Sequence, residues 1–137
     1  MTLSPATLGL LAEARVAEKA QALFYRALAA AAEERNDLAL AERLNGLHAD
    51  EQHHLSRLTA RLVEFEQRLE SLDGVTTPTC DIMSWESTTR DRERAEIARY
   101  EALLRAPLDA TTRALILEFL EAERLHETEL GGKWMGA

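Results

Sequence analysis

The chain has few of the residues that cross-link, bend or interrupt a fold. Its 137 residues include one cysteine, three prolines and six glycines. Because Cys80 is alone, an intramolecular disulfide framework and any Cys-x-x-Cys metal module are excluded within these residues, and a reducing cytoplasm is the expected compartment. Cys80 has no His or basic neighbour in sequence to activate its thiol, so we expect a structural role for it.

Long apolar runs and an excess of positive charge are also absent. No run of about 18 apolar residues occurs, and no basic residue precedes the apolar stretch within residues 1–11, so we expect neither a membrane span nor an export signal. The formal net charge is -8. This charge repels phosphate backbones and anionic lipid surfaces, which disfavours nucleic-acid and membrane partners and favours small cations.

Helix-forming residues make up much of what remains. The chain is rich in Ala, Leu, Glu and Arg, it is 46% hydrophobic, and only 5% of it is aromatic. This composition predicts an all-α fold, and the length predicts a single domain over residues 1–137. A helix is expected from Pro5, with Ser4 as its N-cap, to about Glu34.

Three further helices are expected along the chain. The second should cover residues 38–72 and end at Asp73-Gly74, and the third should begin near Ser87 or Thr88 and end near 105. The fourth should follow Pro107 and Asp109 and end at Gly131-Gly132. Residues 75–86 lack a helical pattern and contain Pro78, so they are expected to be a long crossover between two helical hairpins.

Two Glu-x-x-His pairs lie in these helices. Glu51 and His54 share a face of the second helix, and Glu123 and His126 share a face of the fourth. A carboxylate and an imidazole one turn apart can bind one metal ion, and two such helices facing each other can bind two ions bridged by the carboxylates. Both pairs interrupt apolar stripes, formed by Leu44, Leu47 and Leu58 and by Ile116, Phe119 and Leu130.

The other two helices each place an acid in an apolar stripe. Glu18 lies among Leu11, Ala14, Ala22, Tyr25 and Ala29, and Glu93 lies among Ile97, Tyr100 and Leu104. Since burying an unpaired carboxylate costs several kcal/mol, such acids are usually paired or bind a metal. Alternatively, both acids extend from the stripe edge to water and the histidines pack passively. His48 and His53 are expected at the surface.

The two hairpins also resemble each other. Five of eleven residues coincide between residues 18–28 and 93–103, which indicates either duplication or shared helical composition. In this alignment Gln21 of the first helix corresponds to Glu96 of the third helix. The interval from Glu93 to Glu123 is three residues shorter than that from Glu18 to Glu51. We expect a tighter turn at Pro107 to absorb the difference; otherwise Glu96 rather than Glu93 could shift in role, and the assignment of ligands on the third helix falls into doubt.

Over nearly its whole length the sequence resembles the rubrerythrin branch of the ferritin-like di-iron carboxylate superfamily. The residues that carry the resemblance are Glu18 with Tyr25, Glu51-x-x-His54, Glu93-x-x-Glu96, Tyr100 and Glu123-x-x-His126. The resemblance implies a ferritin-like four-helix bundle and two iron ions, with manganese or mixed occupancy as alternatives. The implied metal ligands are Glu18, Glu51, His54, Glu93, Glu96, Glu123 and His126, with Glu51 and Glu123 bridging.

Some of these roles have an alternative. In rubrerythrins the second glutamate of the third helix replaces a histidine when the iron changes oxidation state, and Glu96 matches it, although Glu96 is equally compatible with a solvated position. Tyr25 and Tyr100 would hydrogen-bond the carboxylates, or would be core aromatics with satisfied hydroxyls.

The implied activity is reduction of hydrogen peroxide or dioxygen. Typical rubrerythrins append a rubredoxin-like site of four cysteines, which these residues cannot form, so an external electron donor is expected. The alternatives are a ferroxidase for iron storage or detoxification and a non-catalytic helical protein that binds partners or a structural metal such as zinc. A homodimer is expected, with or without exchanged hairpins.

Overall fold

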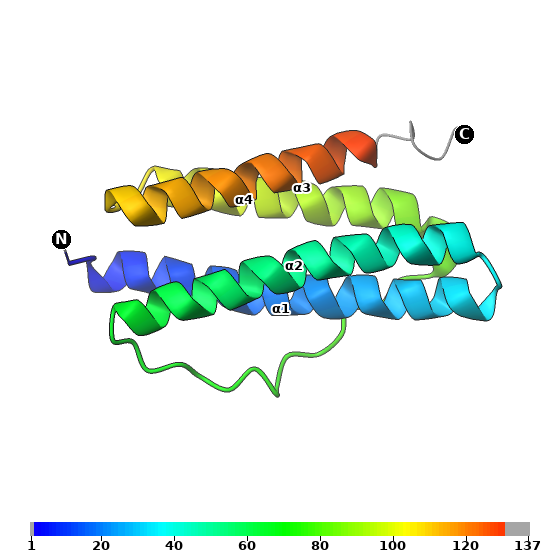
Figure 1. Ribbon diagram of the computed structural model, residues 1–137, viewed down its shortest axis with the longest axis horizontal. Helices are drawn as coiled ribbons and strands as arrows, with labels where there is room; N and C mark the ends of the chain where they lie inside the picture. The colour runs from blue at the N-terminus through cyan, green and yellow to red at the C-terminus, as the bar shows by residue number, and fades with distance from the viewer. Residues whose placement is uncertain (1, 131–137) are drawn as a thin grey trace. The chain divides into compact units, whose positions relative to one another are not determined.

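The computed structural model describes residues 2–130, and this part of the chain is helical with no β-strand (Figure 1). The predicted all-α class is therefore confirmed, and the four helices are compatible with a four-helix bundle. The predicted end of the last helix at Gly131-Gly132 lies outside the described residues. The elements are α1 Pro5–Glu34, α2 Leu38–Glu64, the 3-10 turn η1 Ile82–Ser84, α3 Trp85–Leu104 and α4 Ala110–Glu129.

The described residues form two compact units. One, which we call the α1/α2 unit, consists of residues 12–85; the other, the α3/α4 unit, consists of residues 86–130 together with residues 2–11 at the start of α1. A single domain over residues 1–137 stays a prediction. Among residues 2–130 no helix combines the length and the apolar character that crossing a bilayer requires.

The first helix begins where the sequence predicts. The Thr7 backbone N–H donates to Ser4 Oγ over 3.2 Å, so Ser4 caps the helix and Pro5 occupies its first position. At the other end, Asn36 adopts a left-handed conformation with φ 59° and Asp37 accepts from the Leu40 N–H, which caps α2. These local signals place the turn of the first hairpin at residues 35–37.

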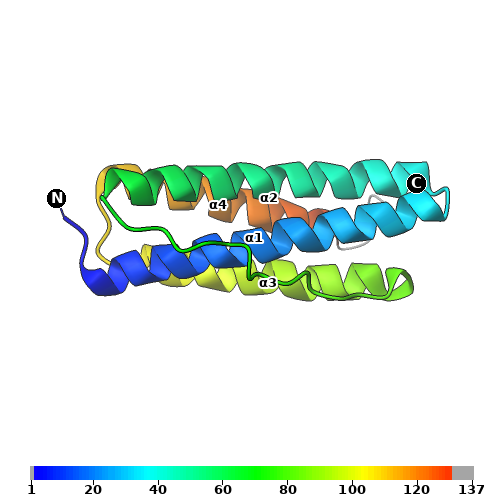
Figure 2. The same ribbon diagram turned by 90° about the horizontal axis from the view of Figure 1, so that it is seen from below.

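The helices α1 and α2 lie side by side as a hairpin in both views of the chain (Figure 1, Figure 2). All six leucines predicted to share a face of α2 are buried, and each such burial stabilises the fold by about 1.5–3 kcal/mol. They are Leu40, Leu44, Leu47, Leu55, Leu58 and Leu62.

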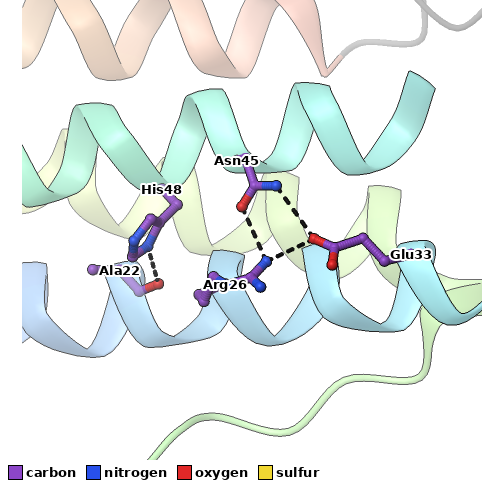
Figure 3. A network of polar contacts seen from close by, with 5 residues as sticks. All are labelled: Ala22, Arg26, Glu33, Asn45 and His48. Carbon is purple, nitrogen blue, oxygen red and sulfur yellow. Dashed lines mark hydrogen bonds and ion pairs between the residues drawn. The ribbon is translucent and has the colours of Figure 1, made fainter. Parts of the chain in front are cut away.

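Polar contacts fix α1 against α2 at the edge of this hairpin (Figure 3). Arg26 of α1 donates to Glu33 over 2.9 Å and to Asn45 of α2 over 3.1 Å, and Asn45 donates to Glu33 over 3.4 Å. The hydrogen bond from Arg26, aided by that from Asn45, lowers the pKa of Glu33. His48 donates from Nδ1 to the Ala22 carbonyl over 2.8 Å. The ring of His48 is therefore half-buried against α1 and only partly at the surface.

The second helix ends earlier than the sequence predicts, at Glu64 rather than at residue 72. Glu66 adopts a left-handed conformation with φ 58°, and the Gln67 N–H reaches back to the Leu62 carbonyl over 3.1 Å. This is the hydrogen bond of a Schellman-type helix end. Glycine usually occupies the left-handed position, and because glutamate occupies it here, no sequence signal marks the end.

The long connection between α2 and α3 starts at residue 65, ten residues sooner than predicted, and it returns along α1 (Figure 2). Arg15 of α1 anchors its first part by donating to the Glu70 carbonyl and to Thr59 of α2, each over 3.0 Å. Further along, a cavity of about 260 Å³ separates it from α1. The cavity lining includes Phe24, Leu28, Pro78 and Cys80.

The hairpin of α3 and α4 forms most of the α3/α4 unit (Figure 1). The helix α3 begins at Trp85, ahead of the predicted Ser87 or Thr88, because Asp81 accepts from the Met83 N–H and caps a 3-10 turn that runs directly into the helix. Asp109 accepts from the Thr112 N–H over 3.2 Å and caps α4.

The turn at Pro107 is not tighter than the turn of the first hairpin. It occupies residues 105–109, whereas the first turn occupies residues 35–37. The shorter interval from Glu93 to Glu123 arises instead because α3 ends at Leu104, eleven residues after Glu93, while α1 continues sixteen residues past Glu18 to Glu34. Proline disfavours helical geometry at the preceding residue, so α3 must end before Ala106.

Candidate metal centre

The α1/α2 unit contains a buried cluster of two carboxylates and one imidazole, which we call cluster A. It consists of Glu18 from α1 and of Glu51 and His54 from α2, with exposed fractions of 0%, 0% and 4%. His54 Nδ1 lies 3.7 Å from Glu18 Oε1 and 3.8 Å from Glu51 Oε1. One possible ligand atom from each of the three residues lies within 4.8 Å of the others.

The geometry of cluster A follows from helical spacing. Glu51 and His54 are three residues apart and therefore share the buried face of α2 with the leucines. Glu18 shares the buried face of α1 with Leu11, Ala14 and Ala22. Because the two buried faces meet within the hairpin, three polar side chains converge in an otherwise apolar region.

The α3/α4 unit contains a second buried cluster, cluster B, with one carboxylate more. Glu93 and Glu96 come from α3, and Glu123 and His126 come from α4. His126 Nδ1 lies 3.6 Å from Glu93 Oε1 and 3.4 Å from Glu123 Oε1. Ligand atoms of Glu96 and Glu123 also lie within 4.8 Å of each other. The exposed fractions are 0–4% for all four residues, Glu93, Glu96, Glu123 and His126.

Burial changes the acidity of cluster B. The pKa of Glu93 is raised to about 7, chiefly because burial desolvates the carboxylate; the hydrogen bond with His126 lowers the pKa and the negative charge of Glu123 raises it. At neutral pH a carboxyl group with this pKa is protonated in a large fraction of the protein molecules. A cation at the same place would replace that proton.

The donor sets fit first-row divalent metals. Carboxylate oxygens and imidazole nitrogens bind such ions at about 2.0–2.2 Å, so two donors of one tetrahedral ion are about 3.4 Å apart and two opposite donors are about 4.2 Å apart. The four imidazole-to-carboxylate distances in the clusters are 3.4, 3.6, 3.7 and 3.8 Å. Each cluster can therefore hold a cation after small side-chain movements, and a mixture of oxygen and nitrogen donors suits iron, manganese or zinc.

The structure decides between several alternatives that the sequence leaves open. Glu18 and Glu93 are both fully buried, so neither extends from a stripe edge to water. Glu96 is 4% exposed, which excludes the solvated position. His53 is exposed, as predicted.

The buried stripe of α3 differs from the predicted one. Ile97 and Leu104 are only half-buried. Thr89, Glu96 and Leu103 lie in the core instead, at exposed fractions of 0%, 4% and 1%. The sequence prediction used steps of three and four residues from Glu93 to Ile97 and Leu104, whereas the helix buries the neighbouring set that runs through Glu96 and Tyr100.

Both candidate tyrosines are core residues. Tyr25 and Tyr100 are fully buried, and their rings lie 5.5 Å from Phe24 and 5.8 Å from Phe119, measured between centroids. These contacts account for their burial. The predicted hydrogen bonds from their hydroxyls to the cluster carboxylates stay a prediction.

Sequence reasoning gave no role to Arg99. Its Nε lies 3.8 Å from Glu96 Oε1, three residues earlier on α3. The spacing of three residues between opposite charges is a signal that would have identified the pair.

The two clusters share a pattern in which the first helix of a hairpin supplies Glu and the second supplies Glu-x-x-His. The first member is Glu18 or Glu93, and the pair is Glu51 with His54 or Glu123 with His126. The pattern thus occurs once in each unit. No protein-family model matches the chain, and no curated protein matches its sequence.

Proposed function

We propose that this chain is a ferritin-like four-helix di-iron carboxylate protein, similar to rubrerythrin, that reduces hydrogen peroxide or dioxygen. One observation carries the proposal: each unit buries a Glu from its first helix beside a Glu-x-x-His pair from its second. Burying five carboxylates across the two clusters is costly unless cations compensate them. The repetition of the pattern supports two cations per chain rather than one.

The proposed ligands are the residues of clusters A and B. Glu18, Glu51 and His54 would hold one ion, and Glu93, Glu123 and His126 would hold the other. Bound ferrous iron would supply the electrons for the reduction of hydrogen peroxide or dioxygen to water. An external electron donor would then return the iron to the ferrous state.

The chain's own residues have three tasks in this proposal. The carboxylates balance the positive charge of the ions, and the buried leucines around cluster A exclude bulk water. Glu93 holds a proton in the metal-free protein and releases it when a cation binds. Tyr25 and Tyr100, fully buried on the helices that carry Glu18 and Glu93, would orient the carboxylates. A homodimer is part of the proposal but is not required by these tasks.

The experiment is a comparison of oxidants on the ferrous-loaded protein. Protein purified without oxygen is loaded with ferrous iron and mixed in a stopped-flow instrument with hydrogen peroxide or with air-saturated buffer. A near-ultraviolet band of oxo-bridged ferric iron should form much faster with peroxide. A protein with Glu51→Gln and Glu123→Gln should form no band, while the control with Glu42→Gln and Glu121→Gln, both exposed on α2 and α4, should behave as the wild type.

A ferroxidase is the second candidate. The observation that favours it is that these 137 residues contain one cysteine and therefore no four-cysteine electron-transfer site. A ferroxidase would consume many ferrous ions per chain with dioxygen and would respond no faster to peroxide. Absence of any iron-dependent band, with stability unchanged in the Glu51 and Glu123 variant, would instead favour a non-catalytic helical protein or one with a structural metal such as zinc.

A further inference from the structure

Arg99 is the basic residue that lies against cluster B. Its Nε is 3.8 Å from Glu96 Oε1, and the side chains are 36% and 5% exposed, respectively. The Nε atom is buried and makes no hydrogen bond within the described residues. The guanidinium group thus extends from solvent towards the cluster, and its contact with Glu96 is electrostatic.

The equivalent place in the α1/α2 unit is neutral. When Glu18 is placed on Glu93, Gln21 corresponds to Glu96 and Phe24 corresponds to Arg99. Gln21 and Phe24 are both buried, at 1% and 0% exposure, and Phe24 packs edge-on against Tyr25. The acid and the arginine are therefore present together in one unit and absent together from the other.

The joint presence of Glu96 and Arg99 has a physical reason. Glu96 is the third carboxylate of a buried cluster that already contains Glu93 and Glu123, and like charges at such separations repel each other strongly in a poorly hydrated site. A guanidinium one turn away offsets that repulsion. Within residues 12–85, cluster A contributes two carboxylates rather than three.

We propose that Arg99 is a positioning residue that holds the carboxylate of Glu96 and competes with a bound cation for it. The proposal rests on the proposed function to the extent that it assumes a cation in cluster B. With Arg99 present, a cation that binds Glu96 Oε1 must compete with the guanidinium for this oxygen. Loss of Arg99 removes this competition for Glu96 Oε1, so cation affinity should increase.

The test is a double-mutant cycle measured by calorimetric titration with ferrous iron under anaerobic conditions. Arg99→Gln should tighten iron binding about tenfold; this equals in size the smallest change usual for residues that support metal ligands, but it has the opposite sign because Arg99 competes with the cation. The same substitution in the Glu96→Gln background should change the affinity less than twofold. Arg99→Lys, which keeps the charge, should restore nearly wild-type affinity. Arg94→Gln removes an equal charge from an exposed position of α3 and should leave the affinity unchanged.

Two results would overturn the proposal. An equal gain in both backgrounds would mean that Arg99 acts only through its long-range charge, and no gain in either would mean that it does not compete for Glu96. Thermal unfolding of the metal-free protein is the second measurement. Arg99→Gln should lower the melting temperature by several degrees, and by much less when Glu96 is already Gln, because the uncompensated carboxylate is then absent.

These measurements separate this proposal from the proposed function. If the wild type binds iron and the Arg99 variants do not differ from it, the positioning role fails and the metal centre stands. If the wild type binds no iron, the metal centre fails, and the unfolding cycle alone decides whether Arg99 holds Glu96. Additive losses of stability would then exclude the positioning role, and non-additive losses would support it.

Discussion

The two hairpins have the same candidate ligands but different charges around them. Each hairpin buries two glutamates and one histidine in the same helical pattern. The α3/α4 unit also has Glu96 and Arg99, at the positions where the α1/α2 unit has Gln21 and Phe24. The candidate ligands therefore occur in both hairpins, whereas the ion pair of Glu96 and Arg99 occurs in only one of them. The comparison teaches that the shared residues are those suited to hold a cation, whereas the residues that differ are those suited to adjust how tightly it is held.

The hairpins also differ in length, but the number of residues from the N-cap of the second helix to its metal-site glutamate is the same. The helices α1 and α2 contain 30 and 27 residues, whereas α3 and α4 contain 20 each. In both hairpins the second helix begins just after an Asp N-cap, and its Glu follows the cap by fourteen residues, from Asp37 to Glu51 and from Asp109 to Glu123. The start of the second helix, rather than the length of the first, therefore determines the phase of Glu-x-x-His.

The largest expected effect comes from removing one charge from each cluster. Glu51→Gln and Glu123→Gln should each weaken divalent-metal binding by at least about 100-fold, because loss of a direct ligand exceeds the usual loss of a supporting residue. Metal-free stability should stay the same or rise, since a buried charge is removed. Calorimetric titration and urea unfolding measure the two quantities. A parallel loss of both affinity and stability would indicate that these acids are structural.

The next largest effect is expected from exchanging Gln21 and Glu96, the corresponding residues that differ between the two units. Gln21→Glu places a third carboxylate in the α1/α2 unit without an arginine one turn away, and it should destabilise the metal-free protein by about 2 kcal/mol. The opposite exchange, Glu96→Gln, should change stability by less than about 1 kcal/mol because the isosteric amide removes a buried charge. Urea unfolding of both variants measures this. Equal losses would show that the two units do not differ in charge compensation.

Metal-free stability should also depend on pH through cluster B. The pKa of Glu93 is about 7 in the folded chain against 4.5 as its ordinary value, so the folded state holds a proton that the unfolded chain has lost. This contribution is fully present below pH 4.5, declines as pH rises and is gone above about 7, and the difference between the two pKa values amounts to roughly 3 kcal/mol. Unfolding of the wild type and of Glu93→Gln at pH 5 and pH 8 measures it. A wild-type slope that survives in the variant would assign the effect to other groups.

The smallest expected effect concerns the helix caps, and here the hairpins should behave alike. Asp37 and Asp109 each accept a hydrogen bond of 3.2 Å from a backbone N–H of the first turn. Asp37→Ala and Asp109→Ala should each reduce stability by about 1 kcal/mol. Thermal or urea unfolding detects this difference, with exposed Glu42→Ala as the control. A much larger loss for one variant would show that the second helices do not begin in equivalent ways.

Much of the fold could be predicted from the sequence because its signals are local. Ser4-Pro5, Asp37 and Asp109 mark helix starts through hydrogen bonds to nearby N–H groups, and apolar periodicity identifies the buried faces of α1, α2 and α4. The end of α2 could not be predicted, because the left-handed residue there is Glu66 rather than glycine.

The candidate site was predictable where a charged residue interrupts an apolar stripe. This criterion found Glu18, Glu51, Glu93 and Glu123, all of which are fully buried. It could not decide the burial of Glu96, because residues 93–104 contain two overlapping stripes and only tertiary packing selects one of them. The half-buried His48 was missed for a similar reason, since its partner is a backbone carbonyl of α1 that no side-chain pattern reveals.

The central claim is that the chain binds two iron ions through both clusters, and anaerobic ferrous titration with counting of the bound ions tests it most directly. The account predicts two ions per chain in the wild type and loss of binding when Glu51 and Glu123 are both replaced by Gln. No iron uptake, or uptake unchanged by those two substitutions, would contradict it.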